Sequence, residues 1–212
     1  DVITMVHEGG HAVHSFLTHP LPITGFKNFP SEVAELASMS MELLTMEHWH
    51  LIYTDPEELR RAKRDQLERV LSILPWVATV DAFQHAIYTH PEWTIKERSK
   101  AWVEIHQRFG GDVVDWSGLD KVRATLWHKQ LHIFEGPFYY IEYAIAQLGA
   151  IGVWRNYKKN PTEALHMYTD ALKLGYTRTL PEIYAKAGIS FDLSVSNVHE
   201  LITFVREELD RL

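Results

Sequence analysis

The amino-acid sequence predicts an all-α fold of many helices with little or no β structure. Four pairs of residues have the spacing of helix capping boxes, in which a glutamate follows a Thr or Asn by three positions: Thr54 with Glu57, Thr94 with Glu97, Thr179 with Glu182, and Asn197 with Glu200. Glycines typical of helix ends stand at 110–111, 175 and 188. Alternation of apolar and polar residues is scarce, and only the segments 21–29 and 189–195 leave room for a strand.

The expected helices follow one another from the start of the chain. Residues 1–13 are expected to belong to a first helix, and a second, largely apolar helix is expected at residues 31–44. A long helical pattern follows at about 56–89, and its charged part, residues 55–70, is expected to be solvent-exposed. Pro75 inside this pattern predicts a kink or a break, because proline has no N–H to donate.

The remaining helices are marked by their start and stop signals. One helix is expected from Thr94 to the glycines at 110–111, and another after the Gly-Pro break at 136–137. Asn160 directly before a proline is a further good helix entry. Thr179 and Asn197 begin the last two expected helices. We find no Gly/Ser linker, so a single helical domain over the whole chain is expected.

Composition excludes several classes of function. The 212 residues are 46% hydrophobic and 12% aromatic, as in a folded globular protein. A formal net charge of -7 argues against a nucleic-acid partner, because binding phosphates needs clustered Lys and Arg. The chain has no cysteine, which excludes disulfides and thiolate zinc ligands and is compatible with the cytoplasm. It has no uninterrupted run of about 18 apolar residues and no secretory pattern, so no membrane partner is expected.

The stretch HEGGHAVH, residues 7–14, has the spacing of a metal-binding helix. His7 and His11 are four residues apart and lie on one helix face, where each can offer a ring nitrogen to one zinc ion. Glu8 flanks that ion and can take a proton from zinc-activated water and pass it to a leaving amine. The helix-weakening glycines at 9–10 indicate a closely packed neighbour or a nearby substrate backbone. The alternative is a buried helix with incidental histidines.

A catalytic zinc site of this type needs a third protein ligand. The metzincin pattern, with glycine and histidine three and six residues after the second histidine, is absent. The helix expected at 31–44 offers Glu32, Glu35 and Glu42, of which the last two share one face of an otherwise apolar helix. Carboxylates there are costly unless they are paired or liganded. We therefore assign Glu35 as the third ligand and Glu42 as a partner that orients a zinc-binding histidine. The alternative is a solvent-exposed face.

Three segments together resemble a known family: HEGGHAVH, the following EVAELASMSMELL, and the later HIFEGPFYYIEYAIAQLGA. They are similar to the catalytic region of the thimet-type oligopeptidases, and most similar to the oligoendopeptidase F branch. The resemblance implies a zincin-like, mostly helical endopeptidase that cuts internal bonds of short oligopeptides in an enclosed channel. It implies one Zn²⁺ held by His7, His11 and Glu35, and Glu8 as the general base.

Full-length members of that family carry a long helical N-terminal half that forms the opposite wall of the channel. We therefore expect residues 1–212 to be the metallopeptidase catalytic domain from the C-terminal portion of a longer protein. The expected partners are an oligopeptide substrate and the missing N-terminal half. Two alternatives remain: a zinc-binding but inactive fragment, and a tetratricopeptide-like interaction module, suggested by residues 161–188. That module would need about three repeats.

The segment HIFEGPFYYIEY, residues 132–143, is a second candidate constellation. Peptide hydrolysis creates an oxyanion, and tyrosine hydroxyls, which stay protonated at neutral pH, are suitable donors to it. The resemblance implies that His132, Tyr140 and Tyr143 handle the substrate. Tyr139 is expected to point to a different side. The alternative is that these aromatic residues belong to the core.

The other histidines are not expected to bind metal. His14 matches the extended signature of the family, and we interpret it as supporting the site from outside the ligand set or as structural. His128 and His132 have the spacing of a metal pair, but no suitable carboxylate follows them. A second metal is therefore not expected.

Overall fold

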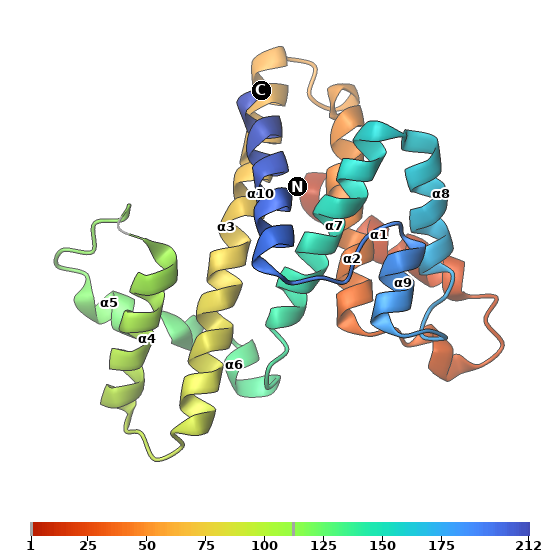
Figure 1. The fold of residues 1–212 in the computed structure, drawn as a ribbon. Coiled ribbons are helices and arrows are strands. Elements are labelled where there is room, and N and C mark those ends of the chain that lie inside the picture. The colour runs from red at the N-terminus through yellow and green to blue at the C-terminus, as the bar shows by residue number, and fades with distance from the viewer. Residues whose placement is uncertain (1, 112) are drawn as a thin grey trace. The chain divides into compact units, whose positions relative to one another are not determined.

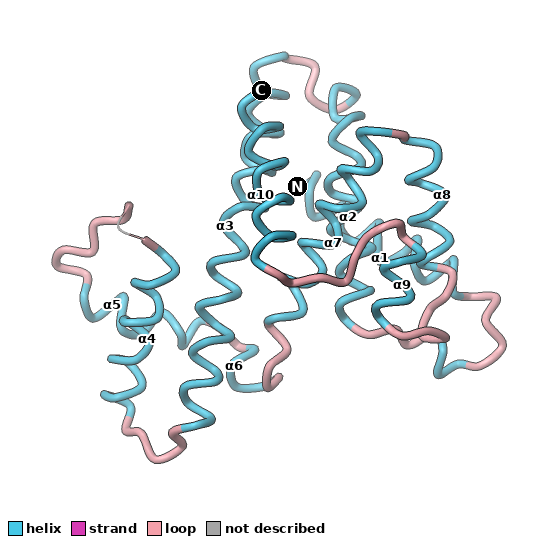
Figure 2. The backbone as a smooth tube through the Cα atoms, in the orientation of Figure 1, coloured by secondary structure: helices cyan, strands magenta, loops and turns pink. Residues whose placement is uncertain are grey.

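The computed structural model describes residues 2–111 and 113–212, and all regular structure in these residues is helical (Figure 2). The prediction of an all-α fold is confirmed. The two segments that left room for a strand contain none among the described residues. Residues 21–29 include the short 3₁₀ helix η1 (Thr24–Lys27), and residues 189–194 form a loop that leads into helix α10 (Val195–Asp210).

The chain divides into two compact units. Unit 1 comprises the residues up to Leu71 together with Ile145–Leu212, and unit 2 comprises Ser72–Ala144. The boundaries fall inside helices α3 (Pro56–Thr89) and α7 (Ile141–Lys159), so both helices contribute to both units (Figure 1). The expected single domain over residues 1–212 stays a prediction.

Each unit contains several further helices. Unit 1 contains η1, α10 and parts of α3 and α7. It also contains α1 (Val2–Thr18), α2 (Ser31–Thr45), η2 (Met46–Leu51), α8 (Pro161–Leu172) and α9 (Leu180–Lys186). Unit 2 contains α4 (Ile95–Gly110), α5 (Asp120–Thr125), η3 (Leu126–Lys129) and α6 (His132–Glu135). Within unit 1, α1, α2, α8 and α9 lie beside one another (Figure 1).

Three predicted helix starts are confirmed by their hydrogen bonds. The Glu97 carboxylate accepts from the Thr94 N–H at 2.8 Å, and the Glu182 carboxylate accepts from the Thr179 N–H at 2.9 Å. The Asn160 side chain accepts from the Glu163 N–H at 3.3 Å, and proline occupies the first position of α8. These contacts satisfy N–H groups that have no partner within the helix, which explains why the starts can be predicted from local sequence.

Two predicted helix starts are wrong by one to three residues. Asp55, not Thr54, accepts from the N–H groups two and three residues further on, at 2.8 and 3.0 Å. Its carboxylate is a charged acceptor and is followed by a proline whose fixed φ suits the first helical position. Ser194, not Asn197, caps α10, because its hydroxyl accepts from the backbone N–H three residues later at 3.3 Å.

Helix α3 continues through Pro75, so of the expected kink or break the break does not occur. Proline removes only one backbone hydrogen bond from the helix. Leu67 and Val70 before it, and Val77 and Val80 after it, are each at most 2% exposed. Burial on both sides of the proline therefore stabilises the helical conformation more than the lost hydrogen bond weakens it.

By length and composition alone, α3 is also able to cross a membrane. A single helix of this kind is weak evidence, because the core helix of a globular protein passes the same test. Val77, Val80 and Phe83 of α3 are fully buried in the core of unit 2. We therefore interpret α3 as a core helix.

The core of unit 2 is aromatic. Phe83 of α3 and Trp102 of α4 are both fully buried, with ring centroids 5.2 Å apart at 84°. The ring centroid of Trp127 in η3 lies 5.3 Å from that of Phe83. Edge-to-face and tilted contacts of this kind add to the stabilisation from burial. Ile133 of α6 and Tyr140 are buried against the same core, which holds the segment around α6 in place.

Helix α2 lies in the core of unit 1. Its residues Leu36 and Ala37 are fully buried together with side chains of α7, α8 and α9. Tyr168 of α8 donates its hydroxyl to the Ala37 carbonyl at 2.7 Å, and burial raises the pKa of Tyr168, so that it remains a donor. Tyr184 of α9 is also buried in this core. Tyr168 and Tyr184, two aromatic residues of the segment that suggested an interaction module, therefore face the core.

Helices α1 and α2 approach closely at Gly10. A Cβ atom at this position would lie 2.5 Å from the Ser38 Cα and 2.8 Å from the Ala37 carbonyl oxygen. At Gly9, by contrast, a Cβ atom would meet nothing within 4 Å. Of the two explanations considered for the glycine pair, a closely packed neighbour therefore applies to Gly10.

Gly10→Ala is expected to lower the free energy of unfolding by about 1–3 kcal/mol, because the added methyl group forces the two helix backbones apart. Gly9→Ala is the matched control, and should raise that free energy by up to about 1 kcal/mol through better helix propensity. Urea denaturation of both variants measures the difference. Equal effects in the two variants would show that helix contact does not explain Gly10.

Candidate functional site

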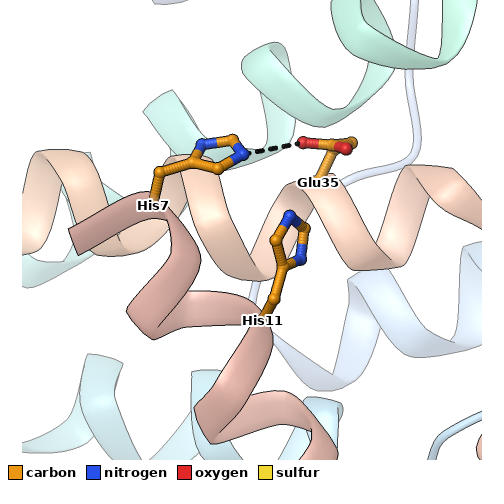
Figure 3. A group of neighbouring side chains, drawn as sticks. All are labelled: His7, His11 and Glu35. Carbon is orange, nitrogen blue, oxygen red and sulfur yellow. Dashed lines mark ion pairs between the residues drawn. The ribbon is translucent and has the colours of Figure 1, made fainter. Parts of the chain in front are cut away.

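Three side chains from two helices meet in unit 1. His7 and His11 project from α1 and Glu35 projects from α2 (Figure 3). Each offers one possible ligand atom, and these atoms all lie within 4.8 Å of one another. His7 Nε2 is 3.5 Å from Glu35 Oε2, and the two imidazole rings are nearly perpendicular, with centroids 5.0 Å apart. The structure thus brings together the three residues that the sequence predicted as a cluster.

This donor set fits a zinc ion. Two imidazole nitrogens and one carboxylate oxygen are a ligand set of catalytic zinc sites, which keep the fourth position open. Two atoms bound to a tetrahedral zinc ion at about 2.0–2.1 Å lie about 3.4 Å apart. The 3.5 Å between His7 Nε2 and Glu35 Oε2 is close to that value. In residues 2–111 and 113–212, this is the one cluster of three such side chains with metal-binding spacing.

The position of Glu35 depends on its helix and on a neighbouring hydroxyl. Its side chain is only 12% exposed. Ser38, one turn later on α2, donates its hydroxyl to Glu35 Oε2 at 3.1 Å. The close approach of α1 to α2 at Gly10 brings this carboxylate within reach of both histidines.

The other ring nitrogen of His7 contacts Glu42 on α2. His7 Nδ1 lies 2.6 Å from Glu42 Oε1. Because a carboxylate accepts hydrogen bonds, the proton of the neutral ring belongs on Nδ1, which leaves the Nε2 lone pair facing Glu35. The pKa of His7 is raised by this hydrogen bond and by the charges of Glu42, Glu35 and Glu8, while burial opposes the rise. Glu42 therefore has the geometry expected of a group that orients a metal-binding histidine.

Gln66 of α3 contacts the same carboxylate and was missed by sequence analysis. Its side-chain nitrogen donates to Glu42 Oε2 at 2.6 Å, and the residue is 1% exposed. It stands within residues 55–70, a charged run that predicts a solvent-exposed helix. An uncharged residue inside a charged run was the only signal, and it is a weak one.

Glu8 and His14 occupy opposite environments on α1. Glu8 is exposed and adjoins His7 in sequence. His14 is fully buried and stacks on Phe29, with ring centroids 3.5 Å apart. Burial, aided by the charge of nearby His11, lowers the pKa of His14 to about 4, so the ring is neutral at pH 7. Of the two interpretations offered for His14, this environment favours the structural one.

In unit 2, three tyrosine rings surround His132. The centroids of Tyr140, Tyr139 and Tyr143 lie 5.0, 5.6 and 5.7 Å from that of His132. The Tyr143 hydroxyl is 3.4 Å from His132 Nε2, and the Gln130 side-chain nitrogen is 2.8 Å from His132 Nδ1. The three residues predicted to handle substrate are therefore neighbours within unit 2.

The expectation that Tyr139 points elsewhere is wrong. Its ring stacks on His132 at an interplanar angle of 19° and also contacts Tyr143. The expectation assumed helical spacing from residue 139, but α7 begins only at Ile141. Phe138, with a φ of 59°, lies in the left-handed region, so the chain turns directly before the tyrosines.

Tyr140 is held by a partner that sequence analysis also missed. Trp76 of α3 donates its indole N–H to the Tyr140 hydroxyl at 3.1 Å and lies 3.3 Å from Gln130 Oε1. Burial raises the pKa of Tyr140, which keeps its hydroxyl protonated. Along the chain, Gln130 is 54 positions and Tyr140 is 64 positions from Trp76. Contacts at such separation leave no local signal in the sequence.

Comparisons with known proteins identify the family of the chain. Residues 1–196 of the chain match the sequence model of peptidase family M3. It is 24% identical over 216 residues to oligopeptidase PepF of Bacillus subtilis (strain 168), covering 100% of this chain and 32% of that protein. It is also 24% identical over 182 residues to an oligoendopeptidase F homolog of Borreliella burgdorferi, covering 82% of this chain and 30% of that protein.

Solved structures show the same similarity. A structure of PZ peptidase A with an inhibitor superposes with a TM-score of 0.92 at 29% identity, covering 100% of this chain and 37% of that one. An oligoendopeptidase-F structure from Enterococcus faecium superposes with a TM-score of 0.71 at 21% identity, and the match covers 99% of this chain and 38% of that one. At this identity, the similarity shows the fold alone. The chain thus spans 30–38% of the length of these relatives.

Proposed function

Because the chain belongs to peptidase family M3, we propose that it is the catalytic part of a zinc-dependent endopeptidase acting on short oligopeptides. One observation carries the proposal: the possible ligand atoms of His7, His11 and Glu35 lie within 4.8 Å of one another. Glu8, which is exposed, directly follows His7 in the sequence. The names of the relatives, oligopeptidase and oligoendopeptidase, support oligopeptides as the substrate class. Since the chain spans about a third of these relatives, its activity on its own is part of the proposal.

The chain's own residues have separate roles in this proposal. A zinc ion held by His7, His11 and Glu35 supplies a Lewis acid that polarises the scissile carbonyl and acidifies water. Glu8 accepts the proton that water loses and delivers it to the leaving amine. The exposure of Glu8 leaves its carboxylate accessible for both transfers. Glu42 keeps the proton of His7 on Nδ1, so that Nε2 serves as the ligand atom.

We further propose that His132, Tyr140 and Tyr143 act on the substrate. Protonated tyrosine hydroxyls are suitable donors to the negative charge that develops on the carbonyl oxygen during hydrolysis. The raised pKa of Tyr140 and the contact between the Tyr143 hydroxyl and His132 support this role. Membership of the peptidase family supports it as well. A cytoplasmic location stays a prediction.

Cleavage of a fluorogenic oligopeptide is expected to depend on zinc. Treatment with a chelator should abolish cleavage by the purified chain, and added Zn²⁺ should restore it, because the proposed chemistry needs the ion. Zinc bound without any cleavage would favour the inactive-fragment alternative. Cleavage that persists in the metal-free chain would contradict the proposal.

Tyr143→Phe is expected to lower kcat by about 10²–10³-fold with little change in KM, because an oxyanion donor acts mainly in the transition state. Tyr157→Phe is the control: it lies on the same helix, α7, with its ring packed against the core of unit 1. Steady-state kinetics of both variants provide the measurement. A proportional loss in substrate binding would assign Tyr143 to binding or packing.

A further inference from the structure

Gln66 lies behind the proposed metal site and is joined to it by two short hydrogen bonds. Its side-chain nitrogen donates to Glu42 Oε2 at 2.6 Å. The other oxygen of the same carboxylate, Oε1, lies 2.6 Å from His7 Nδ1. A continuous chain of hydrogen bonds therefore runs from α3 through α2 to α1 and ends on a proposed zinc ligand.

The orientation of the Gln66 amide follows from the carboxylate it contacts. A flipped amide would place Gln66 Oε1 against Glu42 Oε2, and two acceptors would then face each other. In the observed orientation Gln66 Oε1 is buried, and no donor among the described residues lies within hydrogen-bond reach of it. A buried carbonyl without a partner lowers stability, and an apolar side chain of similar size would avoid that loss. Stability of the core alone therefore does not explain a glutamine at this position.

Fixing Glu42 has a direct effect on His7. A carboxylate held through one oxygen can rotate about its bond to the side chain and exchange partners. The Glu42 side chain is 14% exposed, so water is able to compete for it. With both oxygens held, by Gln66 and by His7, the carboxylate has one orientation, and the His7 ring keeps Nε2 at 3.5 Å from Glu35 Oε2.

We propose that Gln66 is a positioning residue that sets the zinc affinity of the site through Glu42 and His7. This inference rests on the proposed metal site and extends it to a third helix, α3. Groups that hold metal ligands in place without touching the metal contribute about 10–100-fold to affinity. Gln66 acts one step further out, because it holds the group that holds the ligand.

Gln66→Met removes the donor while keeping the length of the side chain. The zinc affinity of the metal-free chain, measured by competition with a chromogenic chelator, is expected to fall by about 10-fold, the lower end of the range for groups that hold a ligand directly. The melting temperature of the metal-free chain reports on stability separately, because removing the unpaired carbonyl stabilises the chain while losing the hydrogen bond to Glu42 destabilises it. Gln66→Leu is the second variant if Gln66→Met does not fold.

Gln147→Met is the matched control. Gln147 of α7 is 5% exposed, and its side-chain nitrogen has no acceptor within reach among the described residues. This variant should leave the zinc affinity unchanged, because it makes the same change to a buried glutamine outside the chain of hydrogen bonds.

A double-mutant cycle separates positioning from a general packing effect. If Gln66 acts through Glu42, then adding Gln66→Met to Glu42→Ala should change the zinc affinity by less than about twofold. Equal losses with and without Glu42, or an unchanged affinity in Gln66→Met alone, would overturn the inference. A wild-type chain that binds no zinc overturns the metal site and this inference together. Wild-type binding with no effect of Gln66 overturns this inference alone.

Discussion

Glu8→Gln is expected to lower kcat for oligopeptide cleavage by about 10²–10⁴-fold, the range for losing a general acid–base group. The glutamine amide has nearly the same shape but does not take up the proton that water loses. Glu8 is exposed and is not part of the cluster of possible metal ligands, so zinc content and folding should not change. Steady-state kinetics and the zinc-to-chain ratio, measured on the same preparation, check both parts.

Glu32→Gln provides the control for this charge change. Glu32 lies in the first turn of α2, where a carboxylate favours the helix terminus, and it is not in the metal-ligand cluster. Its neutralisation should leave kcat close to the wild-type value. Retained zinc with unchanged kcat in Glu8→Gln would exclude Glu8 as the base. A parallel loss of zinc and activity would assign it to metal binding instead.

The cluster of possible metal ligands could be predicted because most of its geometry is local. His7 and His11 stand one turn apart on one helix, and the helical repeat alone fixes their relation. The same repeat places Glu35 and Glu42 on one face of α2, and the structure shows both of these carboxylates in contact with His7. Joining the two helices required one further argument, that carboxylates in an apolar helix need partners.

The features that were not predicted from the sequence depend on how the chain folds around them. Gln66 reaches Glu42 across 24 residues, and its charged neighbours predicted exposure. Tyr139 was misplaced because the turn at Phe138 delays the start of α7. The helix through Pro75 is preserved by burial on both sides, which the local preference of proline does not reveal. At Gln66 and Pro75, packing between distant segments outweighs a local preference.

Glu35→Ala is expected to empty the proposed metal site. Alanine is the best helix former, so α2 should remain intact while one of three proposed ligands is lost. Loss of a group that only orients a ligand weakens metal binding by about 10–100-fold, and loss of a ligand itself should exceed that range. The zinc-to-chain ratio after dialysis and a chelator competition titration provide the measurement.

Thermal melting tests the same change independently of activity. Zinc that binds only the folded chain stabilises it by about 2.7 kcal/mol at a free concentration of 100 times Kd. The zinc-dependent rise in Tm should persist in the control Glu32→Ala and disappear in Glu35→Ala. If Glu35→Ala instead kept a full zinc complement, the third ligand would have to lie elsewhere. Glu42 would then be the first candidate, because it is the other carboxylate of α2 that contacts His7.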